Sequence, residues 1–399
     1  MPLGISRKAA GIVPSATLAL NAKVGVMKAA GENVIGFAGG EPDFDTPVAI
    51  RDAMKAALDA GKTRYTAAAG APELRNAIKG KLKNENGLDY DISQIVVSNG
   101  AKHSIFNAFF ALLNEGDEVI IPTPCWVSYP EMVKMCGGVP VFAQTTEKDN
   151  FVLKPSQIEA AITEKTKVFM LTSPSNPNGS CWGREDLQAL ADLAVKHDFY
   201  IMTDEIYEHL LYNGEKNISI ATLGDKVKER TITINGVSKT YAMTGFRIGY
   251  AAGPKDVMKA IAACQSQATS NPNTPSQYAV IKALTMDQEP VEEMRKAFMK
   301  RRDALVEGLN AIDGISCLKP DGAFYVMMNV RKLIGKKSDG VVIDSCTTFA
   351  EQLLEHAKVA VVPGEAFMAA GFCRLSYALS MDDLLEGIKR IRAFVQSLT

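Results

Sequence analysis

The sequence predicts an α/β protein whose main sheet is mostly parallel and covered by helices. Short runs rich in Val and Ile alternate with helical patterns from about residue 93. Buried parallel strands have this composition, because helices cover both faces of their sheet. Of the 399 residues, 47% are hydrophobic, which suffices for more than one core. We expect a large domain at 46–290 and a smaller C-terminal α/β domain at 291–399.

The expected strands of the large domain are short apolar segments bounded by turn residues. They lie at 94–99, 117–122, 139–143, 166–172, 199–207 and 230–236. Helices are expected at 101–116, 155–163 and 184–197. In the smaller domain, a charged helix at 291–310 precedes expected strands at 323–330, 358–364 and 373–379. Residues 1–45 have little regular pattern and are expected to pack with the small domain.

The bulk properties exclude several classes of protein. A formal net charge of −1 gives no electrostatic reason to bind nucleic acid. The four histidines lack metal-ligand spacing, so no metal is expected. No window reaches the ~18 apolar residues of a membrane helix, and polar residues interrupt the apolar N-terminus, unlike a signal peptide. Seven scattered cysteines without a CxxC pair fit reduced thiols, so we expect a cytoplasmic protein.

Polar residues follow one expected strand after another. They lie at 100–102, 124–126, 173–179, 204–207 and 238–239. Each has an ordinary structural explanation, since Asn-Pro-Asn-Gly is normally a turn and Asp204 can cap a helix. The carboxyl ends of parallel strands meet at one edge of a sheet, where ligands bind. The repetition at successive strands therefore predicts a binding site at that edge.

An anion site is expected within this group. The backbone N–H groups of Ala101 and Lys102 begin an expected helix, where free donors and the helix dipole favour an anion. Arg247 can clamp a phosphate and Ser238 can donate its hydroxyl. Residues 61–63 (GKT) lack the upstream glycine of a Walker A motif, and no GxGxxG occurs. A plain nucleotide site is therefore not favoured.

Lys239 follows the expected strand 230–236 closely. A lone lysine at such a place is most simply an exposed loop residue, because burial of an ammonium is costly. Combined with an aspartate, a tyrosine and a planar aromatic residue, however, it completes the groups that hold pyridoxal phosphate. The lysine forms a Schiff base, the acid keeps the pyridine nitrogen protonated, and the ring needs an apolar face to stack on.

Residues 236–249, GVSKTYAMTGFRIG, resemble the cofactor-attachment motif of class I aminotransferases along their whole length. The resemblance covers nearly the whole chain and includes GGEPDFDTP, RYTAAAGAPELR, PTPCWVSYPEM, SPSNPNG, TDEIYEHLLY, GAFYV and CRLSYA. It is greatest to the subgroup of bacterial aspartate aminotransferases that also contains prephenate aminotransferases. It implies fold type I of the pyridoxal-phosphate enzymes, pyridoxal 5'-phosphate as cofactor, and a homodimer with shared active sites.

The resemblance implies a role for each residue around the cofactor ring. Lys239 would carry the cofactor and shuttle the proton in catalysis. Asp204 would pair with the pyridinium nitrogen, and Trp126 would stack on the ring. Tyr207 and Asn176 would hydrogen-bond the ring oxygen.

The same resemblance implies how the phosphate is held. Arg247, Ser238 and the backbone amides of Ala101 and Lys102 would bind it. Tyr65 would reach the phosphate of the partner subunit's cofactor, which makes the two active sites shared.

The resemblance also assigns residues to the substrate. Arg374 and Asn176 would bind the α-carboxylate near the backbone of Gly40, beside Trp126. In the resembled subgroup, a lysine at the place of Lys102 binds the side-chain carboxylate of aspartate or glutamate.

The substrate is therefore expected to carry a second carboxylate. Lys102 lies at a helix start, where the dipole disfavours a cation, so a role toward a ligand is favoured over a purely structural one. Ser15 and Thr17 offer hydroxyls to the same carboxylate. These assignments predict ping-pong amino transfer between L-aspartate and 2-oxoglutarate.

The chain departs from the resembled family at three positions. Gly236 stands where many relatives have a serine, Cys125 replaces a tyrosine, and Phe246 replaces a tryptophan. None of these changes removes a group that the reaction requires. Prephenate or aromatic transamination and, less favoured, a carbon–sulfur lyase are the alternatives. A pyridoxal-sensing regulator would carry a DNA-binding domain before this region and is disfavoured.

Overall fold

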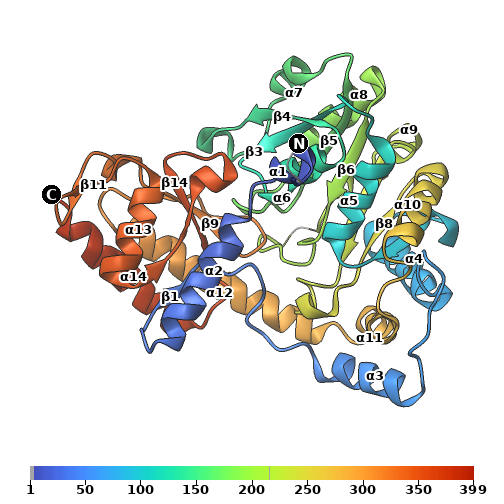
Figure 1. Ribbon diagram of the computed structural model, residues 1–399, viewed down its shortest axis with the longest axis horizontal. Coiled ribbons are helices and arrows are strands. Elements are labelled where there is room, and N and C mark those ends of the chain that lie inside the picture. Colours follow the sequence, from blue (N-terminus) through green and yellow to red (C-terminus); the bar gives the residue numbers. More distant parts are fainter. Residues whose placement is uncertain (1–3, 215) are drawn as a thin grey trace.

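The computed structural model describes residues 4–214 and 216–399 and has an α/β fold, as predicted (Figure 1). Its largest sheet has seven strands in the order β2-β8-β7-β6-β5-β3-β4. In that order, the strands span Ile95–Ser98, Gly249–Ala252, Thr231–Gly236, Tyr200–Asp204, Thr166–Thr172, Glu118–Thr123 and Val139–Gln144. Neighbouring strands are parallel except β8, which is antiparallel to β2 and β7. The mostly parallel sheet is confirmed.

Helices cover both faces of this sheet (Figure 1). Ile121 of β3 packs in one apolar cluster with Ile105 of α5, whereas its neighbour Ile120 packs in another with Leu190 of α8. This division follows because successive side chains of a strand point to opposite faces. The helices around these faces are α5 (Ala101–Leu112), α6 (Ser128–Met135), α7 (Pro155–Ala161), α8 (Arg184–His197), α9 (Asp225–Lys228) and α10 (Lys255–Ala268).

Three further helices gather beside the β2 edge. Ile50 of α3, Ile78 of α4 and Ala279 of α11 are fully buried in one cluster with Ile95 of β2. Their apolar residues recur three and four positions apart, so each helix presents one apolar face. These helices span Val48–Asp59 (α3), Pro72–Asn86 (α4) and Thr274–Thr285 (α11).

The C-terminal part contains a three-stranded antiparallel sheet in the order β13-β14-β9. Its core joins Phe298 of α12, Val326 of β9, Leu353 of α13 and Ile391 of α14. Helix α12 connects this part to the rest of the molecule (Figure 1). The elements are α12 (Glu289–Asn310), β9 (Tyr325–Asn329), β10 (Lys337–Ser338), β11 (Val341–Val342), α13 (Cys346–Ala357), β12 (Val359–Ala360), β13 (Val362–Pro363), β14 (Phe372–Ser376) and α14 (Met381–Ser397).

The N-terminal segment is more regular than the sequence pattern indicated. It contains α1 (Arg7–Ala10), α2 (Ala16–Ala29) and β1 (Ile35–Gly36), and β1 pairs with β12. The expectation of little regular structure was wrong for α2, because its apolar residues lie on several sides: Val24 is buried while Leu18 and Val26 are exposed. The domain boundaries at residues 45 and 290 stay a prediction.

Other local features also differ from the expectations. The strand expected at 358–364 is divided into β12 and β13, which belong to different sheets. The strand expected at 199–207 ends at Asp204, where the chain turns and the N–H of Glu208 bonds the carbonyl of Glu205 at 3.0 Å. Strand β8 was not expected, since its sequence, GYAA, is short and rich in small residues. No helix within the described residues is long and apolar enough to cross a membrane.

Candidate active site

A cavity of about 680 Å³ gathers the residues that follow the strands of the large sheet. Residues of helix α2 and Arg374 of β14 also line it. The predicted site residues that line it are Ser15, Thr17, Gly40, Ala101, Lys102, Trp126, Asn176, Asp204, Tyr207, Ser238, Lys239, Arg247 and Arg374. Tyr65 lies outside its lining and is 87% exposed. All the predicted site residues except Tyr65 therefore line one cavity, which also includes residues that the sequence did not single out, such as Tyr129 and Tyr325.

Lys239 lies in the turn after β7 with its amine inside the cavity. Its Nζ donates a hydrogen bond to the carbonyl oxygen of Gly40 at 2.6 Å. Burial, together with the charges of Arg247 and Arg374, lowers the pKa of this amine to about 8, against the opposing charge of Glu41. Because a neutral amine is the nucleophilic form, the lowered pKa increases the reactive fraction near neutral pH.

Asp204 ends strand β6 with a fully buried carboxylate. Burial raises its pKa to about 6, and a hydrogen bond from Tyr129 opposes that rise. The Tyr129 hydroxyl donates to Asp204 Oδ2 at 2.7 Å and accepts from Thr172 Oγ1 at 2.9 Å. The sequence analysis missed Tyr129, although its place three residues after Trp126 in PTPCWVSYPEM was a usable signal. This chain of hydroxyls holds the carboxylate in one orientation.

Arg374 of β14 is only 2% exposed, and its side chain lines the cavity. Its Nη1 donates to Asn176 Oδ1 at 3.0 Å, and Nη2 donates to the carbonyl of Ala38 at 3.1 Å. Its buried Nε has no hydrogen-bond partner among the described residues. Its guanidinium carbon lies 4.5 Å from the ring centroid of Tyr325. A buried cation with an unused donor is suited to a ligand carboxylate.

Tyr207 and Tyr325 both line the cavity, and their phenols are hydrogen-bonded to each other. Their hydroxyl oxygens are 3.0 Å apart. Burial, together with the neighbouring phenol, raises the pKa of Tyr207 well above its ordinary value. Tyr207 therefore stays protonated and can donate a hydrogen bond to an anionic ring oxygen. The sequence analysis did not assign Tyr325, because its contact with Tyr207 crosses from β9 to the segment after β6.

An anion cradle forms where α5 begins. Arg247 lies so close that a Cβ on Gly100 would come within 2.6 Å of Arg247 Nη2, and Gly100 has φ +85°. A Cβ on Gly249 would come within 2.2 Å of the Ala101 nitrogen. Glycine at these two positions thus lets a guanidinium and the first N–H groups of α5 converge. Such a convergence favours a phosphate.

Lys102, Ser15 and Thr17 line the same cavity from α5 and from the start of α2. The Nζ of Lys102 lies 4.7 Å from the ring centroid of Trp126. Burial and the charge of Arg247 lower the pKa of Lys102. The Ser15 hydroxyl accepts from the N–H of Leu18 at 3.4 Å and caps α2, so it also has a structural task.

The three departures from the expected pattern lie near this cavity. Cys125 is 4% exposed, and burial raises the pKa of its thiol to about 12, so it is no nucleophile at neutral pH. A Cβ on Gly236 would approach Gly249 Cα to 3.0 Å, which leaves little room for a serine. Phe246 packs against the apolar cluster that contains Ile50 of α3 and Ala279 of α11.

Residues 32–391 match the model of the class I and II aminotransferases. The chain belongs to this family. An aspartate aminotransferase of Geobacillus stearothermophilus is 47% identical over 98% of this chain and 99% of its own. An aspartate/prephenate aminotransferase of Nitrosomonas europaea is 45% identical over 98% of this chain and 99% of its own.

The solved structures agree with this family. The aspartate aminotransferase of Thermus thermophilus with maleate has a TM-score of 0.93 and 45% identity, covering 98% of this chain and 100% of its own. The present aminotransferase therefore has fold type I, as expected, and is a pyridoxal-phosphate-dependent transaminase.

Proposed function

We propose that this aminotransferase transfers the amino group of L-aspartate to 2-oxoglutarate and also catalyses the reverse reaction. The observation that carries the proposal is one cavity that holds the Lys239 amine together with two cations, the buried Arg374 and the more exposed Lys102. A dicarboxylic amino acid needs a cation for each carboxylate. The relatives named for aspartate, and the Thermus thermophilus enzyme with the dicarboxylate maleate, support it.

The residues present fit pyridoxal 5'-phosphate. The anion cradle of Arg247, Ser238 and the first amides of α5 would hold the phosphate. Asp204 would pair with the pyridine nitrogen and Trp126 would stack on the ring. Tyr207 and Asn176 would donate hydrogen bonds to the ring oxygen. When bound, the cofactor supplies an aldehyde that accepts the amino group and a ring that draws electrons from it.

Lys239 acts as base and acid in this proposal. Its amine, with a pKa lowered by burial to about 8, would take the α-proton from the amino acid, and the ammonium so formed would return that proton later in the reaction. Arg374 and Asn176 orient the α-carboxylate beside Gly40. Lys102, with the hydroxyls of Ser15 and Thr17, binds the distal carboxylate.

The functional unit we propose is a homodimer in the cytoplasm. The phenol of Tyr65, 87% exposed, would reach the phosphate in the partner's site. No disulfide joins any two cysteines within the described residues, which fits a reducing compartment.

A panel of amino donors with 2-oxoglutarate tests the proposed substrates. We expect aspartate to give the highest kcat/KM, with glutamate as product and parallel lines in double-reciprocal plots. Preference for prephenate as acceptor, or release of pyruvate and ammonia from a cysteine conjugate without glutamate, would replace the proposal by a named alternative. Borohydride reduction should place the pyridoxyl mass on the peptide containing Lys239, and label on another lysine would contradict its role.

A further inference from the structure

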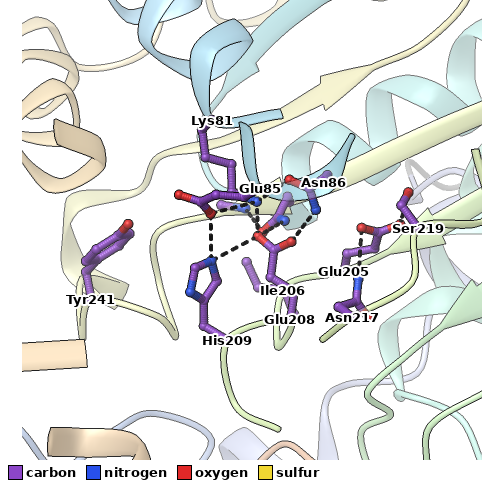
Figure 2. A network of polar contacts seen from close by, with 12 residues as sticks. Lys81, Glu85, Asn86, Glu205, Ile206, Glu208, His209, Asn217, Ser219 and Tyr241 are labelled. Carbon is purple, nitrogen blue, oxygen red and sulfur yellow. Dashed lines mark hydrogen bonds and ion pairs between the residues drawn. The ribbon is translucent and has the colours of Figure 1, made fainter. Parts of the chain in front are cut away.

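A second buried polar network lies behind the segment that follows β6 (Figure 2). Glu208 is its centre, with a side chain only 6% exposed. Its carboxylate accepts hydrogen bonds from Lys81 Nζ, from Asn86 Nδ2 at 2.6 Å and from Asn235 Nδ2 at 2.6 Å. His209 Nε2 lies 3.5 Å from the same carboxylate. These side chains lie outside the lining of the active-site cavity.

The network contains its own cation. Lys81 of α4 is 4% exposed and lies 3.7 Å from Glu85 as well as in contact with Glu208. Glu85, Glu208 and His209 have a spacing that a metal ion could bridge, but two positive charges already balance the two carboxylates there. One is the Lys81 ammonium, and the other is His209, whose pKa is raised to about 9 by its hydrogen bonds with Glu208 and Glu85. Burial by itself would raise the pKa of Glu208, whereas Lys81 and His209 lower it below its usual range. Glu208 is therefore ionised at neutral pH.

The segment after β6 divides its side chains between two environments. Asp204 and Tyr207 line the active-site cavity. The residues that follow them, Glu205 and Glu208, make buried hydrogen bonds outside that lining (Figure 2). Glu205 accepts a hydrogen bond from the Ser219 hydroxyl at 2.7 Å. Because Tyr207 is bonded directly to Glu208, the hydrogen bonds of Glu208 constrain the backbone that carries Tyr207.

Asn235 connects the network to the lysine turn. Its Nδ2 donates to Glu208, and its Oδ1 accepts from the N–H of Gly236 at 2.7 Å. Gly236 opens the short turn that carries Ser238 and Lys239 into the cavity. One carboxylate thus contacts both backbone segments that present the groups of the cofactor site.

We propose that Glu208 is a positioning residue for amino transfer. Paired with Lys81 of α4, it sets the places of Tyr207 and of the turn before Lys239. The proposal rests on the proposed function, since it assigns Tyr207 and Lys239 to the cofactor. Displacing a reacting group by ~1 Å can cost ~100-fold in rate, so a fixed position has catalytic value.

The variant Glu208→Gln tests this proposal together with the double variant Lys81→Met/Glu208→Gln. Glutamine offers one acceptor oxygen where three donors converge. The single variant also removes the nearest charge partner of the buried Lys81 ammonium and leaves it only Glu85, at 3.7 Å. The single variant should therefore melt at a lower temperature. The double variant removes both charges, so its melting temperature should return close to that of the wild type.

The decisive measurements are made on the double variant loaded with pyridoxal phosphate. We expect its visible circular dichroism to differ from the wild type, because the ring and its phenol partner have moved. We also expect kcat to be lowered roughly 10- to 100-fold. The dissociation constant of maleate should stay within about twofold, because Arg374 and Lys102 are untouched.

Arg302→Met is the matched control. Arg302 is 3% exposed in α12 and donates to the carbonyl of Pro320 at 2.9 Å, outside the cavity lining. Its loss should lower the melting temperature and leave visible dichroism and kcat unchanged. Wild-type dichroism and kcat in the double variant would overturn the proposal and leave the network a purely stabilising one. If the wild type itself fails to transaminate aspartate, the proposed function fails, and the dichroism still tests Glu208.

Discussion

Single residues in the cavity have pKa values shifted in opposite directions. Burial lowers the pKa of Lys239 to about 8 and raises that of Asp204 to about 6. Both shifts have the same cause, since a low-dielectric environment disfavours the charged form of either group. The hydrogen bond from Tyr129 opposes the rise in the pKa of Asp204. A phenol that the sequence did not single out therefore affects the charge of this carboxylate.

Tyr129→Phe should shift the pH dependence of turnover. Without the phenol donor, the pKa of Asp204 rises above about 6, so less of it is ionised in weak acid. A hydrogen bond to a charged group is worth about 1.5 kcal/mol or more, so we expect about 10-fold lower kcat at pH 6 and a smaller loss at pH 8. Profiles of kcat from pH 5.5 to 9 measure this. Thr172→Val keeps the phenol and should have a weaker effect, whereas an equal loss at every pH would contradict the assignment.

Lys102→Met should change selectivity rather than turnover in general. A charged hydrogen bond to a desolvated carboxylate is worth about 1.5–3 kcal/mol, so kcat/KM for aspartate should fall about 10- to 150-fold. Alanine has no distal carboxylate, and its kcat/KM should change much less. The backbone amide at this position survives, so cofactor binding should be kept. Equal losses for both donors would assign Lys102 to the cofactor or the fold.

At the scale of elements, the polar network joins helix α4 to the segment after β6. Burial would lower the pKa of His209, but hydrogen bonds with Glu208 and Glu85 raise it to about 9, against the charge of Lys81. The interactions that raise this pKa stabilise the fold fully at pH values below the ordinary histidine pKa near 6.5. Their contribution to stability is lost as the pH rises through about 9. Alkaline solution should therefore loosen this junction.

His209→Gln isolates that contribution. We expect the variant to lose on the order of 1–3 kcal/mol of unfolding free energy at pH 6, and the difference from wild type to shrink by pH 10. Denaturant unfolding at several pH values measures both proteins. His356→Gln on α13 serves as the comparison for removing a histidine outside the network. A difference that is constant with pH would show that His209 stabilises by packing alone.

At the scale of the whole molecule, the proposed homodimer would make the two active sites interdependent. Tyr65→Phe and Lys239→Ala are each expected to be defective, the second almost completely. If Tyr65 serves the partner's site, a dimer with one copy of each has both defects in one site and an intact second site. Purified mixed dimers, made with two affinity tags, should therefore exceed both parents in activity. Absence of recovery in verified mixed dimers would place Tyr65 in its own subunit's site.

Much of this fold was determined by local sequence patterns. Apolar runs with strand length predicted β3, β5 and β7, and helical spacing predicted α8 and α12. Helix α2 escaped prediction because its apolar residues do not lie on one face. Strand β8 escaped because small residues carry little strand signal, and its pairing with β2 and β7 stabilises it instead.

The sequence by itself determined where the cavity forms and many of the residues that line it, because parallel strands deliver the residues after them to one edge of the sheet. Only the tertiary structure decided how those residues are held. Tyr129 meets Asp204, Tyr207 meets Tyr325, and Lys81 meets Glu208 across large separations in the chain. No local pattern encodes such contacts, since each depends on packing elements whose relative places the whole core sets.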